Sequence, residues 1–118
     1  MRFDKYWFYL RATKYNLMSN IITLSQAETE THAYQNAIQF QGLTRACAAD
    51  ASAYSQLLAQ PGCVEVRTYF ALNSNNGLTI VVVGVNSLGE DMTSGIILGD
   101  TRDCPFHCHG SSPLMPWV

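Results

Sequence analysis

Hydrophobic and polar positions change their spacing along the chain, first with a helical period and later with a strand period. Between residues 24 and 38, apolar and small side chains recur every three or four positions, as one face of a helix does: Leu24, Ala27, Thr31, Tyr34 and Ile38. Ser25 and Glu28 have the spacing of a capping box. The pattern predicts a first helix that begins near Ser25 and ends before Gly42, a typical C-terminal stop.

A second helix is predicted from Cys47 or Asp50 to Gln60. Either Asp50 or Ser52 can cap its first turn, because both side chains accept hydrogen bonds from free backbone N–H groups. The dipeptide Pro61-Gly62 ends the helix. Its apolar face consists of Tyr54, Leu57 and Leu58.

The period then becomes that of β-strands. Residues 63–72 alternate, with Val64, Val66, Phe70 and Leu72 on one side and Glu65, Arg67 and Tyr69 on the other, which predicts a strand half-buried on its apolar side, where Thr68 is the polar exception. Asn76-Gly77 is a strong hairpin signal, because both residues tolerate positive φ. Residues 78–85 are nearly all apolar, which is typical of a central strand covered on both faces. A weaker strand is predicted at 92–98, and the chain from Gly99 onwards has the composition of a loop.

This order of elements predicts an α+β fold. Two helices are expected to pack on one face of a small antiparallel β-meander of two to four strands, followed by an irregular tail that contains Cys, His and Pro. A sheet this small has two edges. The tail, residues 21–24 or a second subunit must therefore cover an edge.

The first seventeen residues differ in composition from the rest of the chain. They hold six of the thirteen aromatic residues and four of the seven basic ones, and they have no clear period. Two interpretations stand open: a non-native extension upstream of an initiator at Met18, or an ordinary terminal segment. The length of 118 residues predicts one domain, spanning residues 18–118.

Composition excludes several classes of partner. Charged residues are 14% of the chain, the net charge is −2, and no block of like charges occurs. Nucleic acid and anionic membranes are therefore not expected partners. No segment has the length of a membrane span or the apolar core of a signal peptide, so a reducing cytoplasm is the expected location. A surface with few charges repels itself weakly, which favours self-association.

The most informative chemistry is in the tail, where Cys104, His107, Cys108 and His109 lie within six positions. Thiolates and imidazoles are zinc ligands, and a closed site needs four of them. A ligand from elsewhere could complete the site, taken from Cys47, Cys63, His32, Asp100 and Asp103. A disulfide or redox pair of Cys104 and Cys108 is a second interpretation. A cysteine nucleophile is a third, and cysteines buried as small hydrophobic residues are a fourth.

Two other groups of charged residues each have a structural and a functional interpretation. Glu65, Arg67 and Tyr69 are expected on one strand face, either as a Glu65–Arg67 ion pair or as a small polar binding patch. Glu90-Asp91 follows Gly89 and could either hold a cation or form an ordinary turn. Neither group pairs a base with a nucleophile, so no residue is assigned a catalytic role and an enzyme is not favoured.

From about residue 21 to the end, the chain resembles a set of uncharacterised small bacterial proteins. Their pattern has an Arg-x-Tyr strand, a Val-Gly-Val strand and a Cys-Pro-x-x-Cys-like tail. The matching stretches are Leu57-Leu58-Ala59-Gln60-Pro61-Gly62-Cys63-Val64, Val66-Arg67-Thr68-Tyr69, residues 79–85, Gly89-Glu90-Asp91-Met92 and Cys104-Pro105-Phe106-His107-Cys108. The resemblance implies no activity, but it favours a role for the tail cysteines.

Two functions from different classes follow. The first is a small non-enzymatic interaction or assembly module, with a homo-oligomer or protein partner expected and no cofactor. The alternative is a zinc-binding or thiol-redox module centred on Cys104, His107, Cys108 and His109.

Overall fold

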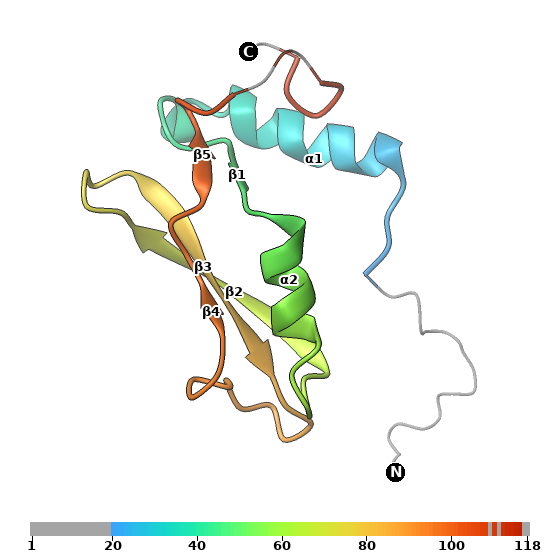
Figure 1. Cartoon of the computed structure of the whole chain (residues 1–118). Helices are drawn as coiled ribbons and strands as arrows, with labels where there is room; N and C mark the ends of the chain where they lie inside the picture. Colours follow the sequence, from blue (N-terminus) through green and yellow to red (C-terminus); the bar gives the residue numbers. More distant parts are fainter. Residues whose placement is uncertain (1–19, 109, 111, 117–118) are drawn as a thin grey trace.

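The structure is a computed structural model that describes residues 20–108, 110 and 112–116. Its elements in chain order are α1 (Leu24–Asn36), the 3-10 helix η2 (Ile38–Phe40), β1 (Ala46–Ala48), α2 (Ala51–Leu58), β2 (Glu65–Leu72), β3 (Leu78–Val85), β4 (Ile97–Leu98) and β5 (Arg102–Cys104). The predicted α+β class is confirmed (Figure 1). The predictions for residues 1–17 and Met18 fall outside the described residues.

Two antiparallel sheets are present in the described part of the chain. The larger one has the strand order β2-β3-β4, and the smaller one pairs β1 with β5. The predicted Asn-Gly hairpin joins β2 to β3, with Asn76 at a positive φ of 62°. Asn73 holds this turn, because its side-chain oxygen accepts hydrogen bonds from the N–H groups of Asn75 and Gly77, both at 2.9 Å.

The core lies between α2 and one face of the larger sheet (Figure 1). Leu57 of α2 is fully buried against Val82 of β3 and Leu98 of β4. Gln60 links the C-terminal end of α2 to the larger sheet, because its Oε1 accepts a hydrogen bond of 2.8 Å from the N–H of Ile96, just before β4. Gly95 leaves room for this contact, since a Cβ there would lie 2.1 Å from Gln60 Oε1. These contacts place α2 over β3 and β4.

The first helix differs from the prediction in its cap and in its position. Thr23, rather than Ser25, is the N-cap, and its hydroxyl accepts the N–H of Gln26 at 3.0 Å. The predicted apolar stripe is not buried, because α1 lies beyond the end of the larger sheet (Figure 1). It contacts the tail instead. His32 Nε2 lies 2.7 Å from the carbonyl oxygen of Pro113, and Gln35 Nε2 donates to Leu114 at 2.9 Å.

The second helix is shorter than predicted. Cys47 belongs to β1, so the alternative start at Cys47 was wrong. Asp50 occupies the N-cap position of α2 but makes no capping hydrogen bond. Its carboxylate accepts a hydrogen bond of 3.1 Å from Arg102 of β5 instead. This ion pair is exposed, so it contributes little to stability.

The stretch after residue 98 was predicted to be loop and contains a strand. β5 pairs with β1 in the register Ala46–Cys104, Cys47–Asp103 and Ala48–Arg102. The predicted strand at 92–98 is reduced to the two residues of β4. Both short strands depend on pairing with a distant partner, which local sequence patterns do not encode.

A buried polar cluster connects the two sheets. Thr101 donates a hydrogen bond of 2.5 Å to Asp103 of β5 and lies 3.2 Å from the hydroxyl of Thr79 in β3. Burial and the Asp103 side chain raise the pKa of the Cys47 thiol to about 11. Burial also raises the pKa of Asp103, but hydrogen bonds from Thr101, Cys47 and Thr79 offset this and hold the net pKa below its ordinary value. Asp103 is therefore a buried carboxylate that accepts hydrogen bonds from its neighbours.

Among the described residues, no helix is both long enough and apolar enough to cross a membrane.

Candidate functional site

The most unusual surface of the described structure is the outer edge of β2. β2 pairs with β3 on one side only, from Glu65–Val85 at one end to Leu72–Leu78 at the other. Asn73 donates its backbone N–H to the oxygen of Gly77, directly opposite, at 2.9 Å. Directly opposite antiparallel residues alternate between hydrogen-bonded and non-hydrogen-bonded pairs. Every second residue of β2, beginning with Leu72 and Phe70, therefore turns its N–H and C=O away from β3.

The same residues carry large apolar side chains that remain exposed. Phe70 is 82% exposed, Leu72 68% and Val66 38%. Val64, just before β2, is also exposed, but it donates its N–H to the oxygen of Val85 at 2.9 Å and so does not belong to this outward-facing set. The register places Phe70 beside Ile80 and Val66 beside Gly84, on the face of the sheet that α2 covers. The sequence prediction of an apolar side that is half-buried on the core was therefore wrong for β2, although the strand itself is confirmed.

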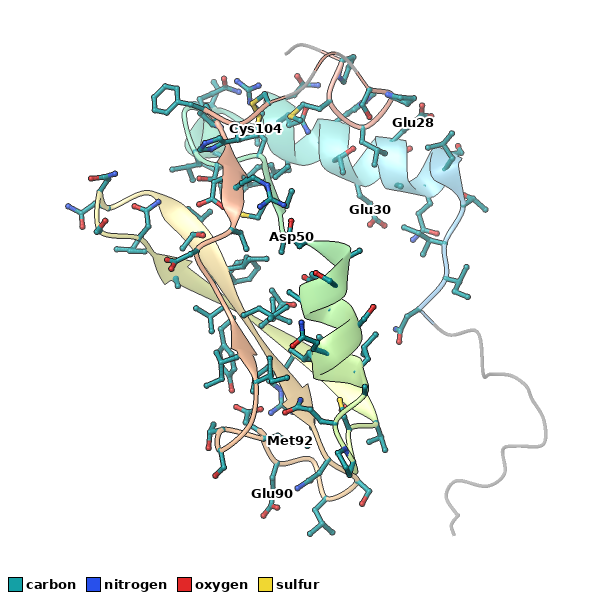
Figure 2. The ribbon with its side chains drawn as sticks, in the orientation of Figure 1. Glu28, Glu30, Asp50, Glu90, Met92 and Cys104 are labelled. Atoms are coloured by element: carbon teal, nitrogen blue, oxygen red, sulfur yellow. A yellow bond between two sulfur atoms is a disulfide. The ribbon has the colours of Figure 1, made fainter. Side chains whose placement is uncertain are left out.

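The size of α2 explains this exposure. A helix of eight residues is about 12 Å long, whereas an eight-residue strand is about 26 Å long. The helix is held over β3 and β4 by Leu57 and Gln60. The helix begins just after Asp50 (Figure 2) and leaves the apolar side chains of β2 uncovered within the described structure. The shortness of the helix, bounded by Asp50 and Pro61, was the sequence signal that could have revealed this exposed strand.

Beside Phe70 the exposed face continues into a shallow groove of about 360 Å³. One wall comes from β2 and β3, and the other comes from α1 and the segment that leads into β1. The groove is lined by Tyr34, Thr44, Arg45, Ala46, Cys47, Phe70, Leu78, Thr79 and Ile80. Cys47 is not a reactive thiol here, because its raised pKa keeps it protonated at neutral pH. The groove therefore offers a surface for packing and no nucleophile.

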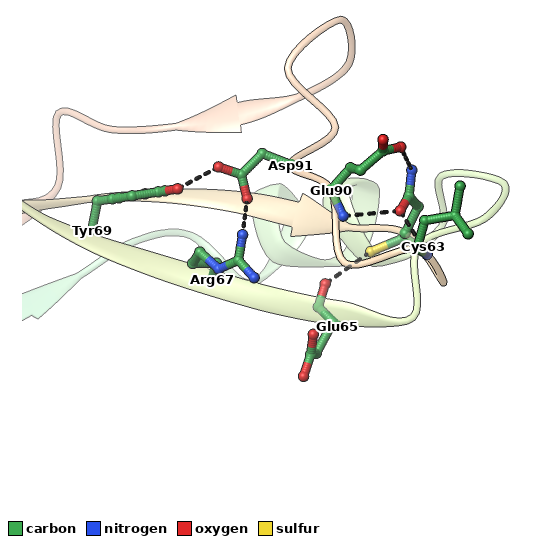
Figure 3. A network of polar contacts seen from close by, with 8 residues as sticks. Cys63, Glu65, Arg67, Tyr69, Glu90 and Asp91 are labelled. Atoms are coloured by element: carbon green, nitrogen blue, oxygen red, sulfur yellow. Dashed lines mark hydrogen bonds and ion pairs between the residues drawn. The ribbon is translucent and has the colours of Figure 1, made fainter. Parts of the chain in front are cut away.

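The opposite face of β2 carries a polar network (Figure 3). Asp91 accepts hydrogen bonds from both Arg67, at 2.5 Å, and the hydroxyl of Tyr69. The side chains of Tyr69 and Asp91 raise the pKa of Arg67 above its ordinary value. The predicted Glu65–Arg67 pair was wrong, because Arg67 pairs with Asp91 across the sheet. The network lies over Val83, which is opposite Arg67 and 3% exposed.

Glu90 and Asp91 both accept hydrogen bonds from other side chains of the protein. Glu90 accepts a hydrogen bond of 3.1 Å from the amide of Asn86, and its N–H donates to the Asn86 side-chain oxygen at 3.0 Å. Asp91 is held by Arg67 and Tyr69. This arrangement is turn chemistry of the kind the sequence allowed as an alternative to a cation site.

The tail residues predicted from sequence are brought together only in part. Cys104 and Cys108 form a disulfide with a Cα–Cα distance of 4.9 Å, and Cys104 is 2% exposed. The side chain of His107 is exposed, while its backbone N–H donates to the oxygen of Asp103 at 2.9 Å. His109 lies outside the described residues. Within the described residues, no three His, Cys, Asp or Glu side chains are grouped as a metal site requires.

The proposed additional ligands lie in different places. Cys47 and Asp103 are directly opposite each other in the β1–β5 pair. Cys104 is the next residue after Asp103, so its side chain points to the other face of that ribbon. Cys63 lies at the far end of the larger sheet, where its sulfur would be 2.9 Å from a Cβ at position 84. A zinc site that uses these ligands together with Cys104 needs a different arrangement of the tail.

The chain matches no protein-family model, no curated protein and no solved structure. The resemblance to small bacterial proteins therefore rests on the quoted motifs alone, and no activity is taken from it.

Proposed function

We propose that the chain is a non-enzymatic assembly module that forms a homo-oligomer through the free edge of β2. The observation that carries this proposal is that one strand has, among the described residues, both unpaired outward backbone groups and exposed apolar side chains. Monomeric proteins usually protect such an edge with Lys, Pro or a bulge. Residues 65–72 contain neither Lys nor Pro, and their pairing with β3 is continuous.

The driving force comes mainly from apolar burial. Removing a large apolar side chain from water contributes about 1.5–3 kcal/mol. Phe70 and Leu72 are each more than half exposed, so an edge partner can bury most of this surface. The low charge of the chain also opposes association only weakly.

The test is the molar mass in solution of the wild type and of two charge variants, measured by light scattering at several micromolar concentrations. Phe70→Lys places a charge on the free edge and is expected to shift the protein towards the monomer. Leu88→Lys is the matched control, because Leu88 is 80% exposed but lies in the turn after β3. It is expected to associate as the wild type does.

Circular dichroism shows whether both variants keep the native secondary structure. A wild type that is strictly monomeric at micromolar concentration contradicts the proposal. Equal effects of Phe70→Lys and Leu88→Lys also contradict it, because the effect would then not be specific to the edge.

The tail provides a second candidate function, which the Cys104–Cys108 disulfide favours. In this alternative, a dithiol reductant donates two electrons and two protons to the disulfide, which yields two thiols while the reductant is itself oxidised to a disulfide. The freed thiols, with His107 and His109, would then be available to zinc as thiolate and imidazole ligands.

Native and denatured intact masses, recorded after reduction and zinc addition, test this alternative. The wild type should carry a zinc-sized increment that is lost on denaturation, and a Cys104→Ser/Cys108→Ser variant should not. The same mass increment on zinc addition for both proteins, or none for either, excludes the alternative. Cys63→Ser is the control, because Cys63 is remote from the tail.

A further inference from the structure

We infer that two copies of the chain pair their β2 strands antiparallel about a two-fold axis that passes between their Thr68 residues. The two three-stranded sheets then become one continuous sheet of six strands. This inference rests on the proposed function and specifies the register of the same edge.

Only alternate residues of β2 direct their backbone N–H and C=O groups outward, and this restricts the possible registers between two β2 strands. Asn73 and Gly77 are a hydrogen-bonded pair, so the alternate residues Val66, Thr68, Phe70 and Leu72 direct their backbone groups outward. In a two-fold antiparallel pair these residues must meet their equivalents in the partner subunit. The candidate registers are those centred on one residue between Val66 and Phe70, because a centre nearer either end of β2 pairs still fewer residues.

Three of these registers are disfavoured by simple physical arguments. A register centred on Arg67 puts two like charges directly opposite each other, which is destabilising. Registers centred on Val66 or Phe70 leave much of β2 beyond the end of its partner. The Arg67-centred register is therefore opposed by charge repulsion, and the other two form few cross-strand pairs.

A register centred on Tyr69 pairs as many residues as one centred on Thr68, so side-chain matching must decide between them. Centred on Tyr69, it sets the hydroxyl of Thr68 against the ring of the partner subunit's Phe70. Such a pair matches a polar group with an apolar one. It also sets Arg67 against the small side chain of the partner subunit's Ala71.

The register centred on Thr68 gives favourable pairs on both faces near the axis and sets Glu65 against the partner subunit's Ala71 only at its ends. Val66 meets the partner subunit's Phe70 on each side of the axis, so these exposed apolar side chains cover one another. Thr68 meets its own equivalent, and a Thr–Thr pair can share a hydrogen bond. On the other face, Arg67 meets the ring of the partner subunit's Tyr69, which attracts a guanidinium group.

The rest of the fold leaves this edge accessible. α2 lies over β3 and β4, and within the described structure no other strand pairs with the outer side of β2. The groove beside Phe70 lies on the same face as the side chains of Val66, Phe70 and Leu72. The apolar surface buried at the axis is therefore continuous with the groove of each subunit.

A charge-rescue experiment distinguishes the registers. Val66→Lys alone and Phe70→Glu alone each place one charge opposite an apolar partner, and each is expected to raise the dimer dissociation constant at least about tenfold. The double variant Val66→Lys/Phe70→Glu places Lys opposite Glu twice in the Thr68-centred dimer. It is expected to restore dimerisation, and the restored dimer should weaken as salt is added. Positions 66 and 70 are four residues apart on one strand, about 13 Å, so the pair cannot form within one subunit.

The matched control is Val66→Lys/Leu72→Glu, which carries the same charges but pairs them only in the Tyr69-centred register. It is expected to remain monomeric. Rescue by this control, or no rescue by Val66→Lys/Phe70→Glu, overturns the Thr68-centred register while the assembly function stands. A monomeric wild type, or single variants that dimerise like the wild type, overturns the proposed function together with the register. Circular dichroism of every variant verifies that the monomers are folded.

Discussion

Leu57 and Leu58 are adjacent leucines on one short helix, and the structure gives them opposite environments. Leu57 is 0% exposed and contacts Val82 and Leu98, whereas Leu58 is 55% exposed. Replacing each in turn with alanine removes the same atoms from the same helix. The two variants therefore compare burial with little difference in helix propensity.

The expected magnitudes follow from these environments. Leu57→Ala removes three carbon atoms from the core, and each buried methylene contributes about 0.8 kcal/mol. This gives about 2.4 kcal/mol, to which the cavity left behind adds, so the free energy of unfolding should fall by about 3 kcal/mol. Leu58→Ala should lower it by about 1 kcal/mol or less, because about half of that side chain is already in water.

Urea unfolding followed by circular dichroism at the helix band measures both values. The loss for Leu57→Ala is a large fraction of the stability typical of a small domain, about 5–15 kcal/mol. Equal losses for the two variants would refute the placement of α2 on the sheet. A larger loss for Leu58→Ala would mean that the other side of the helix faces the core.

Three further predictions concern polar groups. The raised pKa of Cys47, about 11, means that its contribution to stability is complete below about pH 9 and is lost as the pH rises towards 11. The unfolding free energy of the wild type should therefore fall more steeply over this range than that of Cys47→Ser. Gln60→Ala should cost about 1–3 kcal/mol and speed hydrogen exchange at Ile96, whose N–H loses its acceptor. Asp91→Asn should change stability by less than about 1 kcal/mol, and by less still in high salt, because the Arg67 side chain is 42% exposed.

Each of these predictions has a distinct contrary result. Parallel pH profiles for the wild type and Cys47→Ser would show that the thiol is not shielded by burial. Unchanged exchange at Ile96 in Gln60→Ala would show that another group satisfies that N–H. A loss for Asp91→Asn of several kcal/mol, independent of salt, would show that the network over Val83 is far better shielded than its exposure indicates.

Local patterns in the sequence were sufficient for the longer elements of the fold. The alternation of residues 64–72, the Asn-Gly turn and the apolar run of residues 78–85 correctly predicted the β2–β3 hairpin, because strand period and turn chemistry act over a few neighbouring residues. Asp50 and Pro61 similarly bounded α2. The α+β class followed from the order of these elements.

The candidate site depended on relations that the local pattern does not contain. The apolar side of β2 has the alternation of a core-facing strand, and only the position of α2 over β3 and β4 left it exposed. That position depends on Leu57, and on Gln60 meeting Ile96 from thirty-six residues away. The pairing of β1 with β5 and the choice of Asp91 as the partner of Arg67 are likewise long-range contacts.

The amino-acid sequence by itself determined the two α-helices and the β2–β3 hairpin, because period, capping and turn preference are local properties, whereas β1 and β5 depended on their pairing with each other. Tertiary structure alone decided which apolar face is covered, because coverage depends on the length of α2 relative to the sheet and on side chains far apart in the chain. In β2 the local residues are sufficient to specify a strand, but its exposed apolar face results from the position at which α2 packs on the sheet.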